Sequence, residues 1–363
     1  MSALPRHLHP GAWWAWSIGL GVAATSTTNP VLLGLVLGVA GYVVGARRSD
    51  APWARAYVAF LKLGVFVLAV RMALQIVFGQ PLPGRVLFRL PEVTPPDWLA
   101  GIRLGGPVTA EAVVGQLYDG LRLGTLLACV GAANALASPY RLLRSLPGAL
   151  YEAGVVVTVA LAFAPQALVS AAAVREARKL RGRPVRGPMS LRGVVVPVLE
   201  GALTRSVELA ASMDARGYGR RAGTPTSRLA LTGMFGGLLA LCVGTYGLLD
   251  ASTPDVLGFP AMAVGAALLG AALVSGSRRA GRTRYRPDVW RWPEWVVVAA
   301  GLVPPVALLF GDQGPLHPST NPLVAPEVPL VAALALLAGI VPAFVAPRPP
   351  SALPRAALRT AAA

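Results

Sequence analysis

Two short arginine-bearing segments are the parts of this sequence whose residue types and spacing indicate chemistry. The first reads Arg-Glu-Ala-Arg-Lys-Leu-Arg-Gly and ends at Gly182, and the second reads Ala-Ser-Met-Asp-Ala-Arg-Gly-Tyr-Gly and contains Gly217. Both are typical of a helix end, because glycine just past a helix adopts the left-handed conformation at little steric cost and a cation in the last turn suits the helix dipole. We therefore expect Arg181 and Arg216 at two helix tips.

A guanidinium held at a helix tip can bind a carboxylate through two parallel hydrogen bonds, so its natural partner is an acidic pocket on another protein. Either segment alone is also compatible with an ordinary helix end in a basic loop. Their occurrence together, about 35 residues apart, favours the binding interpretation. The six candidate binding residues are Leu180, Arg181, Gly182, Ala215, Arg216 and Gly217.

Together the two segments resemble the signature of the transmembrane T component of energy-coupling factor transporters, the EcfT/CbiQ-like family. The likeness extends upstream through residues 137–147, which are similar to the family's short coupling helix, and it covers roughly residues 10–250. One departure is Leu180, because alanine more often precedes the arginine in the family. The fit at Arg181 is therefore poorer than the fit at Arg216.

The resemblance implies a fold, a function and a set of partners. The fold would be all-α and polytopic, with a cytoplasmic pair of long coupling helices. Arg181 and Arg216 would bind two ATP-binding-cassette ATPase subunits, and these would bind the ATP. The transmembrane helices would hold a small substrate-binding membrane subunit for the uptake of a vitamin or a metal ion.

Composition independently indicates a membrane protein. Of 363 residues, 55% are hydrophobic and only 13% are charged, whereas soluble domains carry about a quarter charged residues. The net charge of +17 resides in short arginine patches between apolar runs, which is typical of cytoplasmic loops rather than of a nucleic-acid-binding surface. We therefore expect a multi-pass protein of the cell membrane, embedded in the lipid bilayer, with no nucleic-acid partner.

Apolar runs and basic clusters predict about eight transmembrane helices with both termini in the cytoplasm. Three parts follow: transmembrane helices in residues 1–137, the coupling region in 138–228, and further helices with a basic tail in 229–363. The proline- and glycine-rich segment 79–110 predicts an external loop with at most one short hairpin. The eight predicted spans are 12–25, 31–46, 56–78, 112–137, 229–249, 256–274, 295–310 and 328–345.

The apolar run 153–174 is the main ambiguity, because it is long enough to cross the bilayer. If it crossed, the arginine-rich stretch 175–228 would lie on the opposite side from Arg47 and Arg141. The positive-inside rule favours the arrangement in which all of these are cytoplasmic. We therefore expect the run to form the first of two long helices along or beneath the membrane, with the second near 195–216.

Charged and sulfur-bearing residues inside the predicted spans require partners or burial. Arg71 lies deep in the third span, and Asp119 of the fourth is its plausible partner. Asp119 and Arg122 share a helical face, where they are close enough to neutralise each other. Cys129 and Cys242 lie in apolar runs without ligand spacing, so we expect small buried residues rather than a disulfide or a metal site.

Catalytic and cofactor motifs are not found in the sequence, so we expect no catalytic residue, no cofactor and no metal site. There is no phosphate-binding loop, and His7, His9 and His317 lack metal-ligand spacing. Two other functions remain open. A self-sufficient secondary transporter would show an internal repeat, and none is found. A membrane enzyme acting on a lipid-linked substrate could use the basic stretch to bind phosphate, but that stretch lacks acidic metal ligands.

Overall fold

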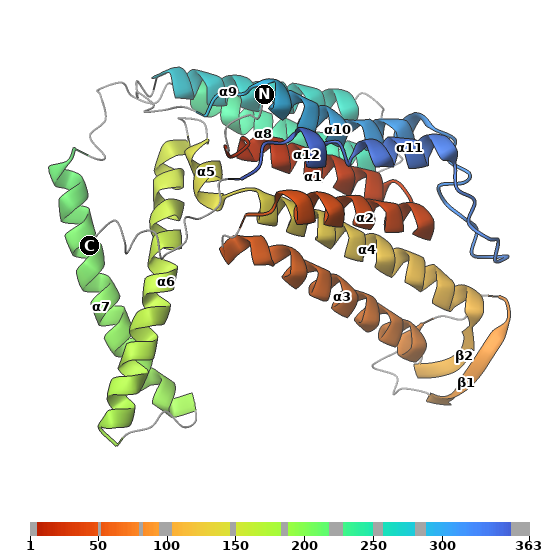
Figure 1. Ribbon diagram of the computed structural model, residues 1–363, viewed down its shortest axis with the longest axis horizontal. Coiled ribbons are helices and arrows are strands. Elements are labelled where there is room, and N and C mark those ends of the chain that lie inside the picture. Colours follow the sequence, from red (N-terminus) through yellow and green to blue (C-terminus); the bar gives the residue numbers. More distant parts are fainter. Residues whose placement is uncertain are drawn as a thin grey trace. The chain divides into compact units, whose positions relative to one another are not determined.

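The computed structural model describes nine stretches of the chain, and they form an all-α polytopic membrane protein with a single β-hairpin among the described residues (Figure 1). Six of its helices are long and apolar enough to cross a membrane. The stretches are residues 6–49, 52–79, 83–93, 104–145, 150–182, 188–217, 228–249, 257–279 and 288–349. The six helices are α2 (Pro30–Arg47), α3 (Ala56–Phe78) with the short η1 (Pro52–Arg55) before it, α6 (Tyr151–Leu180), α8 (Arg228–Leu249), α9 (Phe259–Arg279) and α10 (Trp292–Phe310).

Each of the eight predicted spans coincides with helical structure, but three of them differ from a simple apolar rod. Helix α1 (Pro10–Thr25) has 16 residues and is therefore short for a hydrocarbon core about 30 Å thick. Helix α4 (Ala110–Leu136) has the length but carries three charged residues. The last span is divided into α11 (Leu330–Ala338) and α12 (Pro342–Val345). The number of crossings stays a prediction.

The chain forms two compact units. The first comprises Met1–Leu142 with Asp288–Ala363, and the second comprises Leu143–Pro287. The first unit thus joins the N-terminal helices to α10, α11 and α12. The predicted division at residues 137 and 228 stays a prediction.

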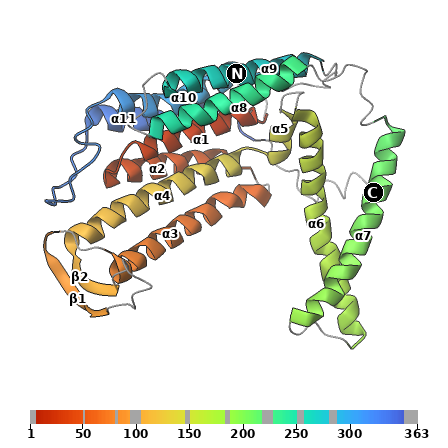
Figure 2. The ribbon, with the colours of Figure 1, turned by 180° about the vertical axis from the view of Figure 1, so that it is seen from behind.

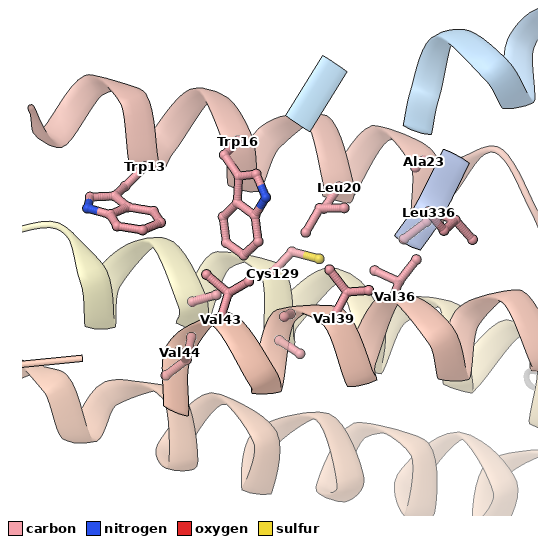
Figure 3. Close-up of a cluster of buried hydrophobic side chains, with 14 of the residues drawn as sticks. Trp13, Trp16, Leu20, Ala23, Val36, Val39, Val43, Val44, Cys129 and Leu336 are labelled. Atoms are coloured by element: carbon pink, nitrogen blue, oxygen red, sulfur yellow. The ribbon is translucent and has the colours of Figure 1, made fainter. Parts of the chain in front are cut away.

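The core of the first unit lies between α1, α2, α4 and the C-terminal helices. Figure 3 shows Trp16 and Leu20 of α1 directed toward Val39 and Val43 of α2, and all four side chains are fully or almost fully buried. Helices α1 and α10 approach closely through glycine, because a Cβ added at Gly19 would collide with a backbone carbonyl of α10. Within a bilayer, such close packing through small residues is a main source of helix association.

The break between α11 and α12 has an identifiable cause. Pro342 has no N–H group, so the regular helical ladder cannot continue through it. The amide of Ala343 instead donates to the carbonyl of Ile340 at 2.9 Å, which releases the carbonyl of Gly339. The buried indole of Trp16 donates to that carbonyl at 3.0 Å. Helix α1 therefore satisfies the backbone group that the break leaves free.

Polar contacts hold neighbouring segments together at each end of the first unit. At one end, the Asn29 side chain donates to the carbonyls of Pro315 and Glu327 at 3.0 and 2.7 Å. At the other end, Arg6 pairs with the buried Glu294, and Arg141 pairs with Asp288 at 2.8 Å. This second end gathers basic positions that the topology prediction placed on one side of the membrane.

Helices α3 and α4 lie side by side and carry the hairpin at one end (Figures 1 and 2). Strands β1 (Val86–Val93) and β2 (Leu104–Thr109) pair antiparallel, which confirms the predicted hairpin. Arg71 donates to the Gln116 side chain at 3.0 and 3.1 Å, while Asp119 lies 3.9 Å away. The predicted carboxylate is therefore near Arg71, but an amide is the closer partner. Arg122 donates to the carbonyl of Thr25 rather than pairing with Asp119.

The two cysteines differ in their burial. Cys129 is buried in the core, as predicted. The prediction of burial is wrong for Cys242, which is exposed. Helix α8 packs against α9 through Gly237 and Gly244, where an added Cβ would meet backbone atoms of α9 at 3.0 and 2.6 Å. Cys242 lies off this glycine face, so its side chain points away from the neighbouring helix.

Candidate functional site

Helices α6 (Tyr151–Leu180) and α7 (Pro188–Ala215) form an antiparallel pair that carries both arginine–glycine segments (Figures 1 and 2). Two long helices were predicted here, and both are present. Helix α7 begins at Pro188, several residues before the expected start near Val195. Each helix ends one residue before its motif arginine.

The end of α6 has the expected capping geometry. Arg181 occupies the C-cap, and its amide donates to the carbonyl of Ala177 at 3.2 Å. The amide of Gly182 donates to the carbonyl of Lys179 at 3.0 Å. Gly182 has φ +70°, the left-handed conformation in which glycine is favoured.

The end of α7 repeats this arrangement. The amide of Arg216 donates to the carbonyl of Met213 at 3.1 Å, and that of Gly217 donates to the carbonyl of Asp214 at 2.8 Å. Gly217 has φ +75°. A Cβ added at Gly182 or Gly217 would meet no atom within 4 Å. Backbone conformation, rather than lack of space, therefore favours glycine at both positions, as the sequence predicts.

Both motif arginines face outward. Arg181 and Arg216 are exposed, and so are Gly182 and Ala215, whereas Gly217 is half-buried. The Leu180 side chain is 84% exposed, which is unusual for a large apolar residue. Neither arginine forms an ion pair with any of the described residues. Both guanidinium groups are thus free to bind a carboxylate of another molecule.

The structure does not bring the six candidate residues into one site. Because α6 and α7 run antiparallel, Leu180–Gly182 lie at one end of the pair and 215–217 lie at the other. Helix α7 has 28 residues, which corresponds to roughly 40 Å at 1.5 Å per residue. The candidate site is therefore two separate helix tips of the same local geometry.

Two contacts between α6 and α7 were not predicted. The Arg178 guanidinium lies where a side chain at Gly193 would be, and its Nε is buried without a hydrogen-bond partner among the described residues. Arg205 donates to the hydroxyl of Ser170 at 3.3 Å. Only the register between the helices brings these residues together, so sequence spacing carries no signal for them.

Within the part of the chain that the structure describes, no three His, Cys, Asp or Glu side chains lie close enough to hold a metal ion. The expectations that the protein has no metal site and no cofactor stay predictions.

The apolar, membrane-length helices among the described residues define a multi-pass membrane protein. The family model described as CbiQ, cobalt transport protein, matches residues 1–226, which is more than half of the 363 residues. The chain belongs to this family. The match spans α1 to α7 and includes both tips, and it ends before α8. A comparison with curated proteins gave no match.

Proposed function

We propose that this protein is the transmembrane T component of an energy-coupling factor transporter, in which Arg181 and Arg216 each bind one ATPase subunit. One observation carries the proposal: two helix ends far apart in the sequence present the same unit, an exposed arginine fixed by a left-handed glycine. A single helix end of this kind is common. A repeated one, with no ion-pair partner for either arginine among the described residues, favours a binding role.

The separation of the tips supports two ATPase subunits rather than one. Two arginines roughly 40 Å apart at opposite ends of a helix pair are too distant to enter one pocket. A guanidinium fork recognises a carboxylate through two hydrogen bonds, whereas lysine offers only a point charge. Each ATPase would therefore present an acidic groove to one tip. ATP would be bound and hydrolysed on these partners.

The exposed apolar surface of α6 and α7 supports a further partner, a small substrate-binding membrane subunit. Large apolar side chains on both helices are exposed, including Leu168 and Val169 of α6 and Leu203 and Val207 of α7. A weakly charged surface of this kind would let a membrane-embedded subunit pack and tilt without breaking specific polar contacts. In this arrangement the cargo, a vitamin or a metal ion such as the cobalt of the family's name, is chosen by that subunit.

The proposed location is the cell membrane, with both termini and both tips in the cytoplasm. Arginine patches at the basic end of the first unit and in residues 175–228 would then all lie inside, in agreement with the positive-inside rule.

Crosslinking followed by substitution tests the proposal. A photo-reactive residue placed at position 216, and separately at 181, should crosslink in native membranes to an ATP-binding-cassette ATPase identified by mass spectrometry. Arg216→Ala should then abolish capture of that ATPase by the affinity-tagged protein, and Arg216→Lys should restore little of it, because lysine keeps the charge but not the fork. Arg181→Ala should reduce capture less, in line with the departure at Leu180.

Two control variants distinguish the loss of a docking contact from the general loss of one positive charge. Arg175→Ala on α6 and Arg192→Ala on α7 each remove one exposed arginine from the same helix without touching a tip. These variants should retain the ATPase. Unchanged capture by the Arg181→Ala, Arg216→Ala double variant would refute the proposal.

A further inference from the structure

A second basic site lies in the first unit, whereas both arginine–glycine tips belong to the second unit. It is a small cleft that is partly open to solvent. Three arginines line it, together with two serine hydroxyls and two tryptophans. These residues are Arg6, Arg47, Arg141, Ser49, Ser138, Trp13 and Trp53. The proposed docking of ATPase subunits makes no use of it.

The charges in the cleft do not balance among the described residues. Glu294 accepts two hydrogen bonds from Arg6, at 2.9 and 3.1 Å. Asp288 pairs with Arg141 at 2.8 Å. Arg47 instead donates to backbone carbonyls, to Ala343 at 2.6 and 2.9 Å and more weakly to Phe344 at 3.3 Å. Of the three lining arginines, Arg47 is therefore the one without a carboxylate partner among the described residues.

Neighbouring groups strengthen the positive character of the cleft. Pro347 and Pro349 line it, and the exposed Arg348 lies between them in the sequence. His7 also lines it, and burial, followed by the charge of Arg141, lowers the pKa of His7 below its ordinary value of 6.5. His7 is therefore neutral at pH 7 and offers a hydrogen bond rather than a charge.

The cleft lies where helices leave the hydrophobic part of the unit. Its lining comes from the start of α1 and the segment before it, the end of α2 with η1 after it, the end of α4 with α5 (Pro139–Arg144) after it, and the segment after α12. Trp13 and Trp53 are of the residue type enriched at the depth of lipid headgroups. Basic clefts between transmembrane helices at a membrane surface are suited to the phosphate of an anionic lipid.

We propose that this cleft binds a singly charged phosphate group, supplied by the headgroup of an anionic phospholipid, with Arg47 as the cation that the protein leaves without a carboxylate partner. The headgroup phosphate enters the cleft while the acyl chains remain beside the helices. The site depends on membrane insertion and not on the ATPase partners, so it stands or falls independently of the proposed function.

Two pairs of variants isolate the cleft from the general surface charge. Arg47→Gln and Arg48→Gln each remove one positive charge at the end of α2, but only Arg47 lines the cleft. Ser49→Asp and Ser49→Asn have nearly the same shape and differ by one negative charge inside the cleft. The second pair keeps the test decisive if Arg47→Gln impairs folding, because Ser49 is only half-buried and lies beyond the end of α2.

The purified full-length protein is titrated with phosphatidylglycerol, with phosphatidylcholine as the zwitterionic comparison, and bound lipid is counted by native mass spectrometry. Phosphatidylglycerol should bind saturably and more tightly than phosphatidylcholine. Arg47→Gln and Ser49→Asp should weaken binding about fivefold, because each lowers the positive charge facing the phosphate by roughly one unit. Arg48→Gln and Ser49→Asn should stay within about twofold of the unaltered protein.

Inorganic phosphate distinguishes the two sources of the anion. If phosphate binds with the same dependence on Arg47 and Ser49 while phosphatidylglycerol does not, the cleft binds a free phosphate, and the lipid part of the proposal is overturned. Equal effects of Arg47→Gln and Arg48→Gln, together with equal effects of the two Ser49 variants, would overturn the site altogether. Non-saturable binding of both anions would do the same.

Discussion

At Gly182 and Gly217 the backbone turns out of the helix directly after the arginine. Both residues have positive φ, and both have open space around the position of a side chain. Alanine in this conformation costs roughly 1–2 kcal/mol, whereas asparagine adopts it more readily. The identity of these residues is therefore tied to the conformation of the helix end and not to packing.

Gly217→Ala should consequently loosen the end of α7 without affecting the rest of the protein. Hydrogen exchange of the amides at positions 213–217 should become faster, because the C-terminal hydrogen bonds no longer close without strain, and Gly217→Asn should have a smaller effect. Gly201→Ala is the matched control, since Gly201 lies inside α7 with equally open surroundings. It should slow exchange, because alanine favours a helix interior by about 1 kcal/mol relative to glycine. Equal exchange in Gly217→Ala and in the unaltered protein would contradict this explanation.

Residue-level prediction succeeded where the signal is local. The left-handed glycines were predicted because glycine after a cation-bearing helix end has a short-range physical reason. The contact of Arg178 with Gly193 was not predicted, since it depends on how two helices are aligned. Arg71 shows an intermediate case: the charge demanded a polar partner within the membrane, but the choice of Gln116 over Asp119 depends on side-chain geometry.

At the scale of elements, apolar runs predicted the positions of the membrane-length helices but not whether each one is continuous. The final apolar run was expected as one span, and it breaks at residues 339–341. Pro342 provides the local reason. The released carbonyl of Gly339 is tolerated only because Trp16, more than 300 residues earlier, donates a hydrogen bond to it. No local pattern contains that information.

Trp16→Phe should therefore lower the stability of the protein around the break between α11 and α12. The loss should be larger than the smaller side-chain volume alone explains. The substitution keeps an aromatic ring but leaves a buried carbonyl without a donor, at a cost of roughly 1–3 kcal/mol. Thermal unfolding should begin at a lower temperature, and amide exchange should rise in residues 336–346. Trp14→Phe serves as the control, because Trp14 on the same helix is only half-buried. If the two variants proved equally stable, the hydrogen bond would have no measurable role.

At the scale of the whole molecule, the orientation of α6 decides between the two topologies. Its length and apolar composition suit a crossing, whereas the distribution of arginines favours a helix that stays on the cytoplasmic side.

Labelling of single cysteines from each side of the membrane resolves this question. In a Cys242→Ala background, a cysteine at Ser212 near the second tip and one at Arg48 should be labelled from the cytoplasmic side only. A cysteine at Ser319, in the loop at the opposite end of the first unit, should be labelled from outside. Labelling of positions 48 and 212 from opposite sides would mean that α6 crosses, and the two tips could not then both reach cytoplasmic ATPases.

The contacts between α6 and α7 also make the two tips mechanically unequal. Arg181 lies three residues beyond Arg178, which is held against α7, whereas Arg216 lies eleven residues beyond Arg205, which contacts α6. At 1.5 Å per residue, these free lengths are about 5 Å and about 16 Å. Arg181 therefore lies close to the contact that holds its helix, whereas Arg216 lies at the far end of a longer helical segment beyond such a contact. The same sideways pull on both would therefore deflect the second much further.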